Sequence, residues 1–260
     1  MTTFSSRGFI AGLFSVLLAG FWSAAAAEET KQPQQQSYIK KLPKDGVFRI
    51  VVLGDSLANG LHQGLTQLNK KNDLLKTTRK SKVNTGLVRV DRYDWNKGTK
   101  KIAASKKYDI AIVLLGLNDL QSIREKGKAH HFQTDGWVKR YVMRTENMMN
   151  DLKKSGMAVY WTGIPITSPK RYQKEYAYLN GIYKKAAENT DVRFIDTWTV
   201  LADANGQFTP YWKTPEGKKE IIRHKDGVHF SPDGYQIFAG IVNDIIQADI
   251  KDVQNRNSSQ

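Results

Sequence analysis

The sequence predicts an α/β fold in which helices cover both faces of one parallel sheet. Two apolar, β-branched runs, residues 48–54 and 108–116, end at glycine and are typical of buried parallel strands. Strand and helix patterns then alternate along the chain, as a parallel sheet with crossover helices requires. In such sheets ligands bind at the carboxyl ends of the strands, so we expect the chemistry in the loops that follow them.

A helix is expected directly after the first strand, beginning at Asp55 or Ser56. Leucines recur every three or four residues as far as Leu68, which places them on one helix face. Beyond it we expect a weaker strand at 73–78, a polar loop through Gly86 and a basic helix near 97–107.

The second half of the chain continues the alternation. A helical period covers 137–155, and Gly156 is suited to end that helix. The last helix begins near Ser231, where Ser-Pro-Asp supplies an N-cap followed by proline in the first turn. Between these helices we expect strands at 157–162 and 192–196, with a helix at 171–188.

Composition narrows the classes of function. The 260 residues contain no cysteine, which excludes a disulfide scaffold, a thiolate metal site, a cysteine nucleophile and an anchor attached through cysteine. The chain carries 40 Lys and Arg against 25 Asp and Glu, a formal charge of +15. A charge of this size indicates an anionic partner, which could be a nucleic acid, an acidic membrane surface or an acidic polymer.

The N-terminal residues predict export. Residues 1–27 place Arg7 before an apolar run and a stretch of alanines, in the order of a secretory signal peptide cut after Ala27. The alternative is an uncleaved membrane anchor, because the apolar run approaches spanning length. We therefore expect a periplasmic or secreted protein without a stable transmembrane segment after cleavage, and no nucleic acid as its partner. The expected organisation is a flexible leader at 28–46, one domain at 47–250 and a flexible tail at 251–260.

Three short patterns can carry chemistry. Ser56 follows the first strand, where the free N–H groups of a helix N-terminus stabilise a developing oxyanion, although a serine there can also simply cap the helix. Asn118 follows the strand at 108–116 and can offer an amide N–H to an oxyanion or form an Asx turn. Asp226 lies three residues before His229, so its carboxylate can orient the imidazole as a general base, unless His229 is a surface residue beside a cap.

Together these patterns resemble the GDSL or SGNH hydrolase family. The resemblance lies in VVLGDSLANGL around Ser56, in LLGLNDL around Asn118 and in KDGVHFSPDGY around His229. Gly86 is the best match to the family's remaining glycine block, with Gly98 as the alternative. The stretches WTGIPITSPKRYQKEYAYLNGIYKKAAE and FIDTWTVLADANGQF resemble a bacterial exported subfamily whose substrates are poorly assigned. The resemblance implies a flavodoxin-like three-layer α/β/α sandwich with a five-stranded parallel sheet.

The same resemblance implies a serine esterase mechanism. Ser56 is the nucleophile, His229 the base and Asp226 the residue that orients it. The oxyanion hole consists of the backbone N–H groups of Ser56 and Gly86 with the Asn118 side chain. No cofactor or metal is implied. The expected substrate is an acylated, above all acetylated, envelope or extracellular glycan or a small ester. The alternatives are an O-acyltransferase acting on a periplasmic polysaccharide, and a non-catalytic glycan-binding or scaffold protein.

Two further expectations concern the substrate. Tyr93, Trp95 and Trp198 follow predicted strands and are candidates to stack on a sugar, although such residues more often pack in a core. Residues 61–110 hold 13 Lys and Arg but only 4 Asp and Glu, and they include the Gly86 loop. We therefore expect this charge to flank the site and to hold an anionic envelope polymer beside the ester, with a merely solvated face as the alternative.

Overall fold

A computed structural model describes residues 38–214 and 216–259 of the chain. Its centre is a parallel sheet with the strand order β2-β1-β3-β6-β7, as the flavodoxin-like expectation requires. The expected five-stranded α/β fold is therefore confirmed. The strands are β1 (Phe48–Gly54), β2 (Leu75–Ser81), β3 (Ile110–Leu114), β6 (Ala158–Thr162) and β7 (Arg193–Ile195).

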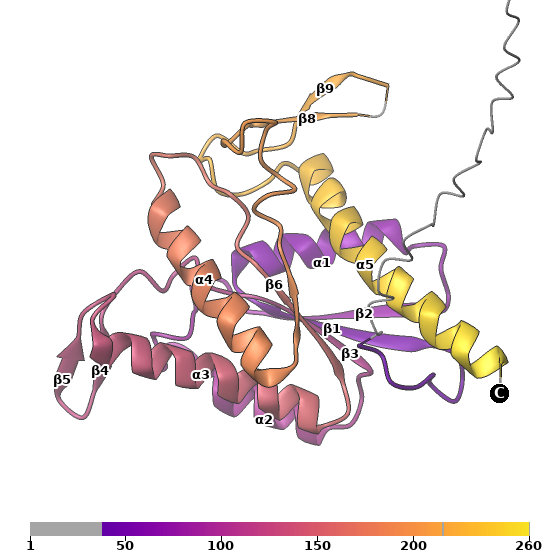
Figure 1. Ribbon diagram of the computed structural model, residues 1–260, viewed down its shortest axis with the longest axis horizontal. Coiled ribbons are helices and arrows are strands. Elements are labelled where there is room, and N and C mark those ends of the chain that lie inside the picture. Colours follow the sequence, from indigo (N-terminus) through magenta and orange to yellow (C-terminus); the bar gives the residue numbers. More distant parts are fainter. Residues whose placement is uncertain (1–37, 215, 260) are drawn as a thin grey trace, which may run out of the picture. The chain divides into compact units, whose positions relative to one another are not determined.

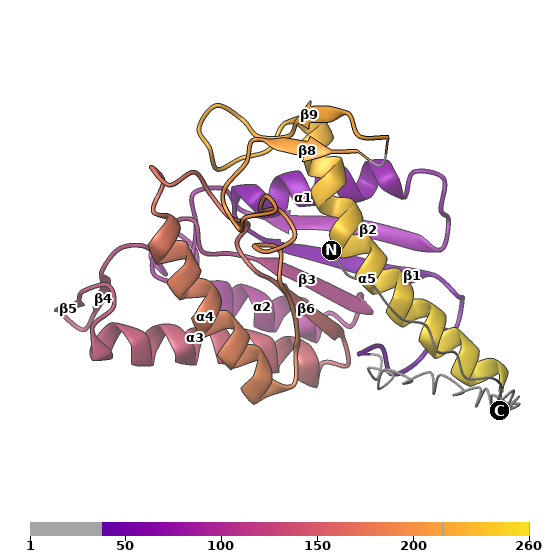
Figure 2. The same cartoon turned by 45° about the horizontal axis from the view of Figure 1, so that its top comes forward.

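Helices cover both faces of this sheet (Figures 1 and 2). On one face α1 (Ser56–Leu68) packs against α5 (Pro232–Ser258). On the other, α3 (Asp135–Lys154) lies between α2 (Trp95–Ala104) and α4 (Gln173–Thr190). All five helices lie within a few residues of their predicted positions.

The central strands form because their residues can be buried on both faces. Every residue of β3 and β6 is buried, and both runs are apolar apart from Thr162. Helix ends follow the expected capping chemistry. The Asp55 carboxylate accepts a hydrogen bond from Leu57 N at the start of α1, and the Ser231 hydroxyl accepts one from Gly234 N at the start of α5.

Two small antiparallel hairpins were not predicted. The first joins β4 (Ile123–Glu125) to β5 (Lys128–His130) within the long loop before α3. The second joins β8 (Tyr211–Lys213) to β9 (Lys219–Ile221), labelled in Figure 1, and comes between β7 and α5 in the sequence. Each strand has three residues of mixed polarity, which is too short to show a two-residue period.

The expected flexible segments at the two ends need correction. Part of the predicted leader is packed, because Ile39 is 3% exposed within the core. The predicted tail continues α5 as far as Ser258, and Val253 on this last part is 1% exposed. Arg256 also donates a hydrogen bond to the carbonyl of Ile39. A few apolar side chains in otherwise polar segments are therefore enough to order both.

The predicted signal peptide at 1–27 lies outside the described residues. Among the residues that the structure describes, none of the helices combines the length and apolar character needed to cross a membrane.

Candidate active site

The loops after β1, β2 and β3 meet at the carboxyl edge of the sheet. Gly54 ends β1 with φ +142°, and a Cβ there would lie 1.8 Å from the carbonyl oxygen of Leu114 in β3. Only glycine allows this approach, which lets Asp55 N donate to the same carbonyl oxygen at 3.2 Å. The turn that carries Ser56 is thereby held against the end of the neighbouring strand.

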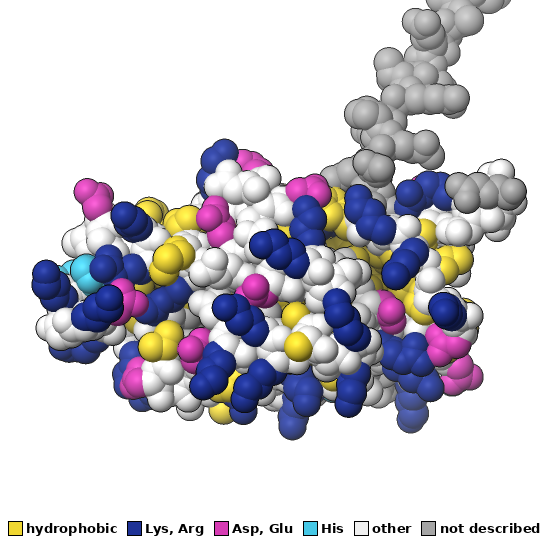
Figure 3. All heavy atoms as spheres, turned by 90° about the horizontal axis from the view of Figure 1, so that it is seen from below, with side chains coloured by type: hydrophobic (Ala, Val, Ile, Leu, Met, Phe, Trp, Pro, Cys, Tyr) yellow, Lys and Arg dark blue, Asp and Glu magenta, His cyan; other side chains and the backbone are white. Residues whose placement is uncertain are grey.

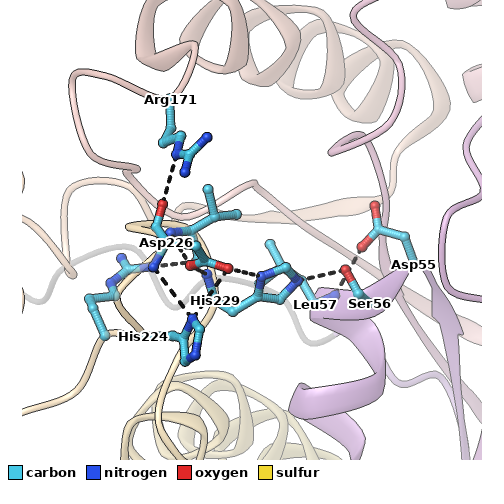
Figure 4. A network of polar contacts seen from close by, with 9 residues as sticks. Asp55, Ser56, Leu57, Arg171, His224, Asp226 and His229 are labelled. Carbon is cyan, nitrogen blue, oxygen red and sulfur yellow. Dashed lines mark hydrogen bonds and ion pairs between the residues drawn. The ribbon is translucent and has the colours of Figure 1, made fainter.

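A serine and a histidine from distant parts of the chain meet at this edge (Figure 4). Ser56 is the first residue of α1, and its Oγ lies 2.8 Å from Nε2 of His229. His229 belongs to the turn before α5, 173 positions further along the chain. The packing of α1 against α5 brings these two residues together.

Asp226 completes a chain of hydrogen bonds through His229. Its Oδ2 lies 2.7 Å from His229 Nδ1, and its Oδ1 accepts hydrogen bonds from Val228 N and His229 N, both at 2.9 Å. Burial raises the pKa of this carboxyl, but the hydrogen bonds from the Val228 amide and the His229 side chain outweigh it and lower the pKa to about 2. The carboxylate is therefore charged at neutral pH.

The charge on Asp226 decides the imidazole tautomer. An ionised carboxylate only accepts hydrogen bonds, so the proton of neutral His229 must lie on Nδ1. Nε2 is then a free base, and it accepts the hydrogen bond from the Ser56 hydroxyl. This arrangement can remove the Ser56 proton when the oxygen attacks an electrophile. His229 is 36% exposed, so a substrate can reach the dyad from solvent.

Two loops supply candidate oxyanion donors. Asn118 lies beyond β3, and its Nδ2 donates to the carbonyl of Thr85 at 2.9 Å, which ties it to the Gly86 loop. This bond uses one of the two amide N–H groups and leaves the other for a ligand. Among the residues that the structure describes, no acceptor meets the backbone N–H of Ser56 or of Gly86. These are donors that could stabilise an oxyanion.

Asp119 holds the Gly86 loop in place. Its carboxylate is fully buried and accepts hydrogen bonds from Leu87 N, Val88 N and the Tyr141 hydroxyl. Burial raises the pKa of this carboxyl. A Cβ on Gly86 would lie 2.1 Å from Asp119 Oδ1, so the loop can reach this carboxylate only with glycine at that position. The close approach to Asp119 therefore requires glycine at position 86. A Cβ on Gly98 would instead lie closest to the Tyr93 hydroxyl oxygen, at 2.2 Å.

Asp55 positions two loops of the site, a role that the sequence analysis did not predict. Besides capping α1, its Oδ2 accepts hydrogen bonds from Gly116 N and Leu117 N, so one carboxylate joins the Ser56 turn to the loop that carries Asn118. The side chain is fully buried, and burial raises its pKa to about 7 against the opposing effect of the backbone N–H bonds.

Two arginines support the turn that carries His229, and sequence reasoning missed both. Arg171 donates from Nε to the carbonyl of Asp226 at 3.0 Å (Figure 4). Arg223 donates to the carbonyls of Val228 and Ile166, and burial lowers its pKa to about 9. Its guanidinium lies 3.7 Å from the ring centroid of Phe230, the residue after His229. Arg223 lies three positions before Asp226 in the sequence, and this is the only signal that could have predicted its role. Nothing in the sequence indicates the role of Arg171.

The three aromatic candidates for sugar stacking have different surroundings. Trp95 was wrongly predicted, because it is 1% exposed and donates from Nε1 to Thr85 Oγ1 inside the core. Tyr93 is half-buried, with its ring edge-on to Trp95 and the Lys82 ammonium 4.8 Å from its centroid. Trp198 lines a cavity of about 220 Å³ beside α4. A substrate contact for Tyr93 and Trp198 stays a prediction.

The expected position of the positive charge was wrong for Lys106 and Lys107, although Lys82, Arg89 and Arg92 follow β2 on the side of the Gly86 loop. Lys106 and Lys107 precede β3, whereas Ser56 follows β1. Because the strands are parallel, the two lysines lie at the amino edge of the sheet, opposite the candidate site.

Within 38–214 and 216–259, no three His, Asp or Glu side chains gather closely enough to hold a metal ion.

Residues 49–244 match the family model DUF459, described as a protein of unknown function. The chain belongs to this family. None of the curated proteins matches it in sequence.

Solved structures of similar fold include a GDSL-like lipase and several esterases. A GDSL-like lipase from Bacteroides thetaiotaomicron is 14% identical with a TM-score of 0.55, over 79% of this chain and 91% of that one. A mutant of Axe2, an acetylxylan esterase from Geobacillus stearothermophilus, is 16% identical with a TM-score of 0.53, over 76% and 94%. Esterase EstA from Pseudoalteromonas sp. is 13% identical with a TM-score of 0.51, over 77% and 97%. The DUF459 chain thus has the SGNH hydrolase fold, as its sequence motifs predicted.

Proposed function

We propose that this DUF459 protein is a serine esterase that removes short acyl groups, above all acetyl, from a glycan. The observation that carries the proposal is the hydrogen-bonded chain from Ser56 through His229 to an ionised Asp226. If Ser56 only capped α1, an imidazole nitrogen 2.8 Å from its hydroxyl would have no purpose. If His229 were only a surface residue, it would not need the Asp226 carboxylate, which also accepts a hydrogen bond from the backbone N–H of His229.

The first half of the reaction forms an acyl-enzyme. The Ser56 oxygen bonds to the ester carbonyl carbon while its proton passes to His229 Nε2. The carbonyl oxygen becomes an oxyanion, held by the Asn118 amide and the N–H groups of Ser56 and Gly86. When the intermediate collapses, the bond to the alcohol oxygen breaks and His229 gives its proton to that oxygen.

The second half regenerates the enzyme. A water molecule loses a proton to His229 and bonds to the acyl carbon, and the bond to Ser56 Oγ breaks as the serine recovers its proton. The products are a free hydroxyl on the glycan and a carboxylic acid. Asp226 stays ionised throughout and stabilises the imidazolium that forms twice in the cycle.

The openness of the site supports a short acyl group on a large substrate. His229 and Asp226 are 36% and 33% exposed, so an acyl group that projects from a bulky chain can reach Ser56. Two proteins of the same fold, AlAXEase and Axe2, are acetyl xylan esterases, and the alanine variants of a Ser and of an Asp in Axe2 are catalytic mutants. An exported enzyme, periplasmic or secreted, would meet such a glycan, in line with the signal peptide expected at 1–27.

The test measures acetate released from acetylated xylan and from p-nitrophenyl acetate. Ser56→Ala should lower turnover of both by about 10³-fold or more, because the nucleophile is lost. Ser122→Ala is the matched control, since Ser122 Oγ lies 3.1 Å from His131 Nδ1 in a second serine–histidine pair that has no aspartate partner among the described residues. The control should keep wild-type turnover. Retained turnover in Ser56→Ala would place the nucleophile elsewhere.

The same assay separates the rival functions when a glycan acceptor is added. Free acetate alone supports hydrolysis, whereas acetylated acceptor supports the O-acyltransferase, which uses the same acyl-enzyme with a sugar hydroxyl in place of water. No turnover of any ester by the wild-type protein would favour the non-catalytic glycan-binding or scaffold protein.

A further inference from the structure

Two adjoining cavities form a groove at the amino edge of the sheet. Their volumes are about 870 and 510 Å³, and both are lined by Arg49, Lys106, Tyr108 and Asp109. The larger cavity extends to Ala158 in β6, and the smaller to β2. The groove therefore crosses the ends of β6, β3, β1 and β2, a distance of roughly 14 Å at the usual strand spacing.

Positive charge predominates strongly among the side chains that line this amino-edge groove. Seven Lys and Arg side chains line it, against two acids, Asp45 and Asp109. Both acids are engaged, because Asp45 pairs with the Arg49 guanidinium and Asp109 accepts a hydrogen bond from Arg49 N. Among the described residues no carboxylate pairs with five exposed lysines of the groove, Lys40, Lys41, Lys44, Lys76 and Lys107.

These lysines come from separate parts of the chain. The segment before β1 carries Lys40, Lys41 and Lys44, β2 carries Lys76, and the turn before β3 carries Lys107. Lys106 reaches across the groove and donates to the carbonyl of Ser155, which follows α3. Like charges brought together without counter-charges repel, so an anion that occupies the groove gains from the attraction of several ammonium groups at once.

The shape of the groove distinguishes the kinds of anionic partner. A membrane is flat and meets charges that protrude, whereas these lysines border a hollow long enough for an extended chain. Lys and Arg side chains are also spread over the face on the side of α2 and α3 (Figure 3), so the groove must be compared with lysines outside it. A linear polymer with repeated negative charges can follow such a hollow and contact the lysines in turn.

We propose that the amino-edge groove binds a linear anionic polymer, through carboxylate or phosphate groups repeated along its chain. The groove lies at the opposite edge of the sheet from Ser56, so a chain held there leaves the candidate active site open. The groove would keep the protein on an acidic polymer while the other edge is free for its own substrate. This inference does not depend on esterase activity.

The test is binding of the purified protein to polygalacturonate, to poly(glycerol phosphate) and to neutral dextran at low salt. We expect binding to at least one of the two anionic polymers and none to dextran. The double variant Lys76→Glu/Lys107→Glu should lower the affinity by about tenfold or more and reduce its salt dependence, because two cationic contacts are reversed. The matched control is Lys97→Glu/Lys139→Glu, which changes the net charge equally at two exposed positions outside both cavities. It should keep the affinity within about twofold.

Each other outcome overturns the proposal. Equal loss in the two double variants would show attraction to the net charge alone. Absence of binding to both anionic polymers, with binding to vesicles that contain phosphatidylglycerol, would assign the groove to a membrane surface. The two anionic polymers separate the carboxylate from the phosphate source.

Discussion

The two edges of the central sheet differ in how their side chains are held. At the carboxyl edge, Asp55, Asp119 and Asp226 each accept hydrogen bonds from backbone N–H groups and fix a loop. At the amino edge, lysines such as Lys76 and Lys107 are exposed and have no carboxylate partner among the described residues. The first edge is rigid and nearly complete in itself, whereas the second has charge that its own residues leave unbalanced.

This difference separates two kinds of function. Catalysis needs atoms held at fixed distances, and the hydrogen bonds of the carboxyl edge provide them. Attraction to a charged polymer needs only several mobile charges on one side of a groove. Substitutions at the carboxyl edge should therefore change turnover, and substitutions at the amino edge should change polymer binding alone.

The largest effect at the carboxyl edge, apart from loss of Ser56, is expected from Asp226→Asn. The amide places a donor where His229 Nδ1–H needs an acceptor, so the wrong tautomer is favoured and kcat for p-nitrophenyl acetate should fall by about 10³- to 10⁴-fold. Because the pKa of Asp226 is about 2, any loss of turnover in mild acid must come from another group.

Asp203→Asn is the matched control for that measurement. Asp203 accepts backbone N–H bonds from Asn205 and Gln207 in an exposed turn without a histidine. The Asp203→Asn variant should keep the wild-type kcat. An equal decrease of kcat in both variants would show that Asp226 only shapes its turn.

Asn118→Ala should have the next largest effect. Loss of one oxyanion donor typically lowers kcat by about 10²- to 10³-fold, with KM changed little. Asn96→Ala is the control, because Asn96 Nδ2 also donates to a backbone carbonyl, that of Arg144, away from the site. A KM effect with unchanged kcat would contradict the assignment of Asn118 to the oxyanion.

Asp55→Asn tests how the buried carboxyl joins its two loops. The pKa of Asp55 is raised to about 7 in the folded protein, so its contribution to stability is full below its ordinary pKa of 3.8 and is lost as the pH rises through about 7. The free energy of unfolding of the wild type, minus that of Asp55→Asn, should therefore decrease between about pH 4 and 7, by at most about 1.4 kcal/mol per pH unit.

Urea unfolding at several pH values measures this difference. Asp94→Asn is the control for the substitution itself, because Asn at this exposed cap of α2 can still accept the hydrogen bond from Lys97 N. A difference that grows with pH would mean that Asp55 is ionised in the folded protein and that its backbone N–H bonds outweigh burial.

The smallest effect is expected from the amino edge. Lys76→Glu/Lys107→Glu should leave kcat and KM for p-nitrophenyl acetate within about twofold, because a neutral ester has no use for remote charge. A large change in kcat would break the separation between the two edges.

Most of the carboxyl edge was predictable because each block is short in sequence and lies directly after a predicted strand or before a predicted helix. Ser56, Asn118 and His229 lie in such blocks, and the parallel strands confirm that the first two share one edge. The hydrogen bonds that bring His229 to Ser56 depend on the packing of α5 against α1, which no local pattern records.

The amino edge was not predictable for a different reason. Counting charge along residues 61–110 locates it in the chain, but a segment that runs from one edge of the sheet to the other contributes to both. The groove also depends on Lys40 and Lys41, in a segment expected to be flexible. The prediction for Trp95 was wrong for a similar reason, because its place after a predicted strand does not reveal that its indole donates a hydrogen bond to Thr85 within the core.

The central claim is that Ser56 is an activated nucleophile, and labelling by a fluorophosphonate probe tests it most directly. The probe bonds covalently to a serine whose proton a nearby base removes. The account predicts one adduct on the native protein, located on Ser56 by peptide mass spectrometry and absent from Ser56→Ala and His229→Ala. No adduct on the folded wild-type protein, or an adduct on another serine, would contradict it.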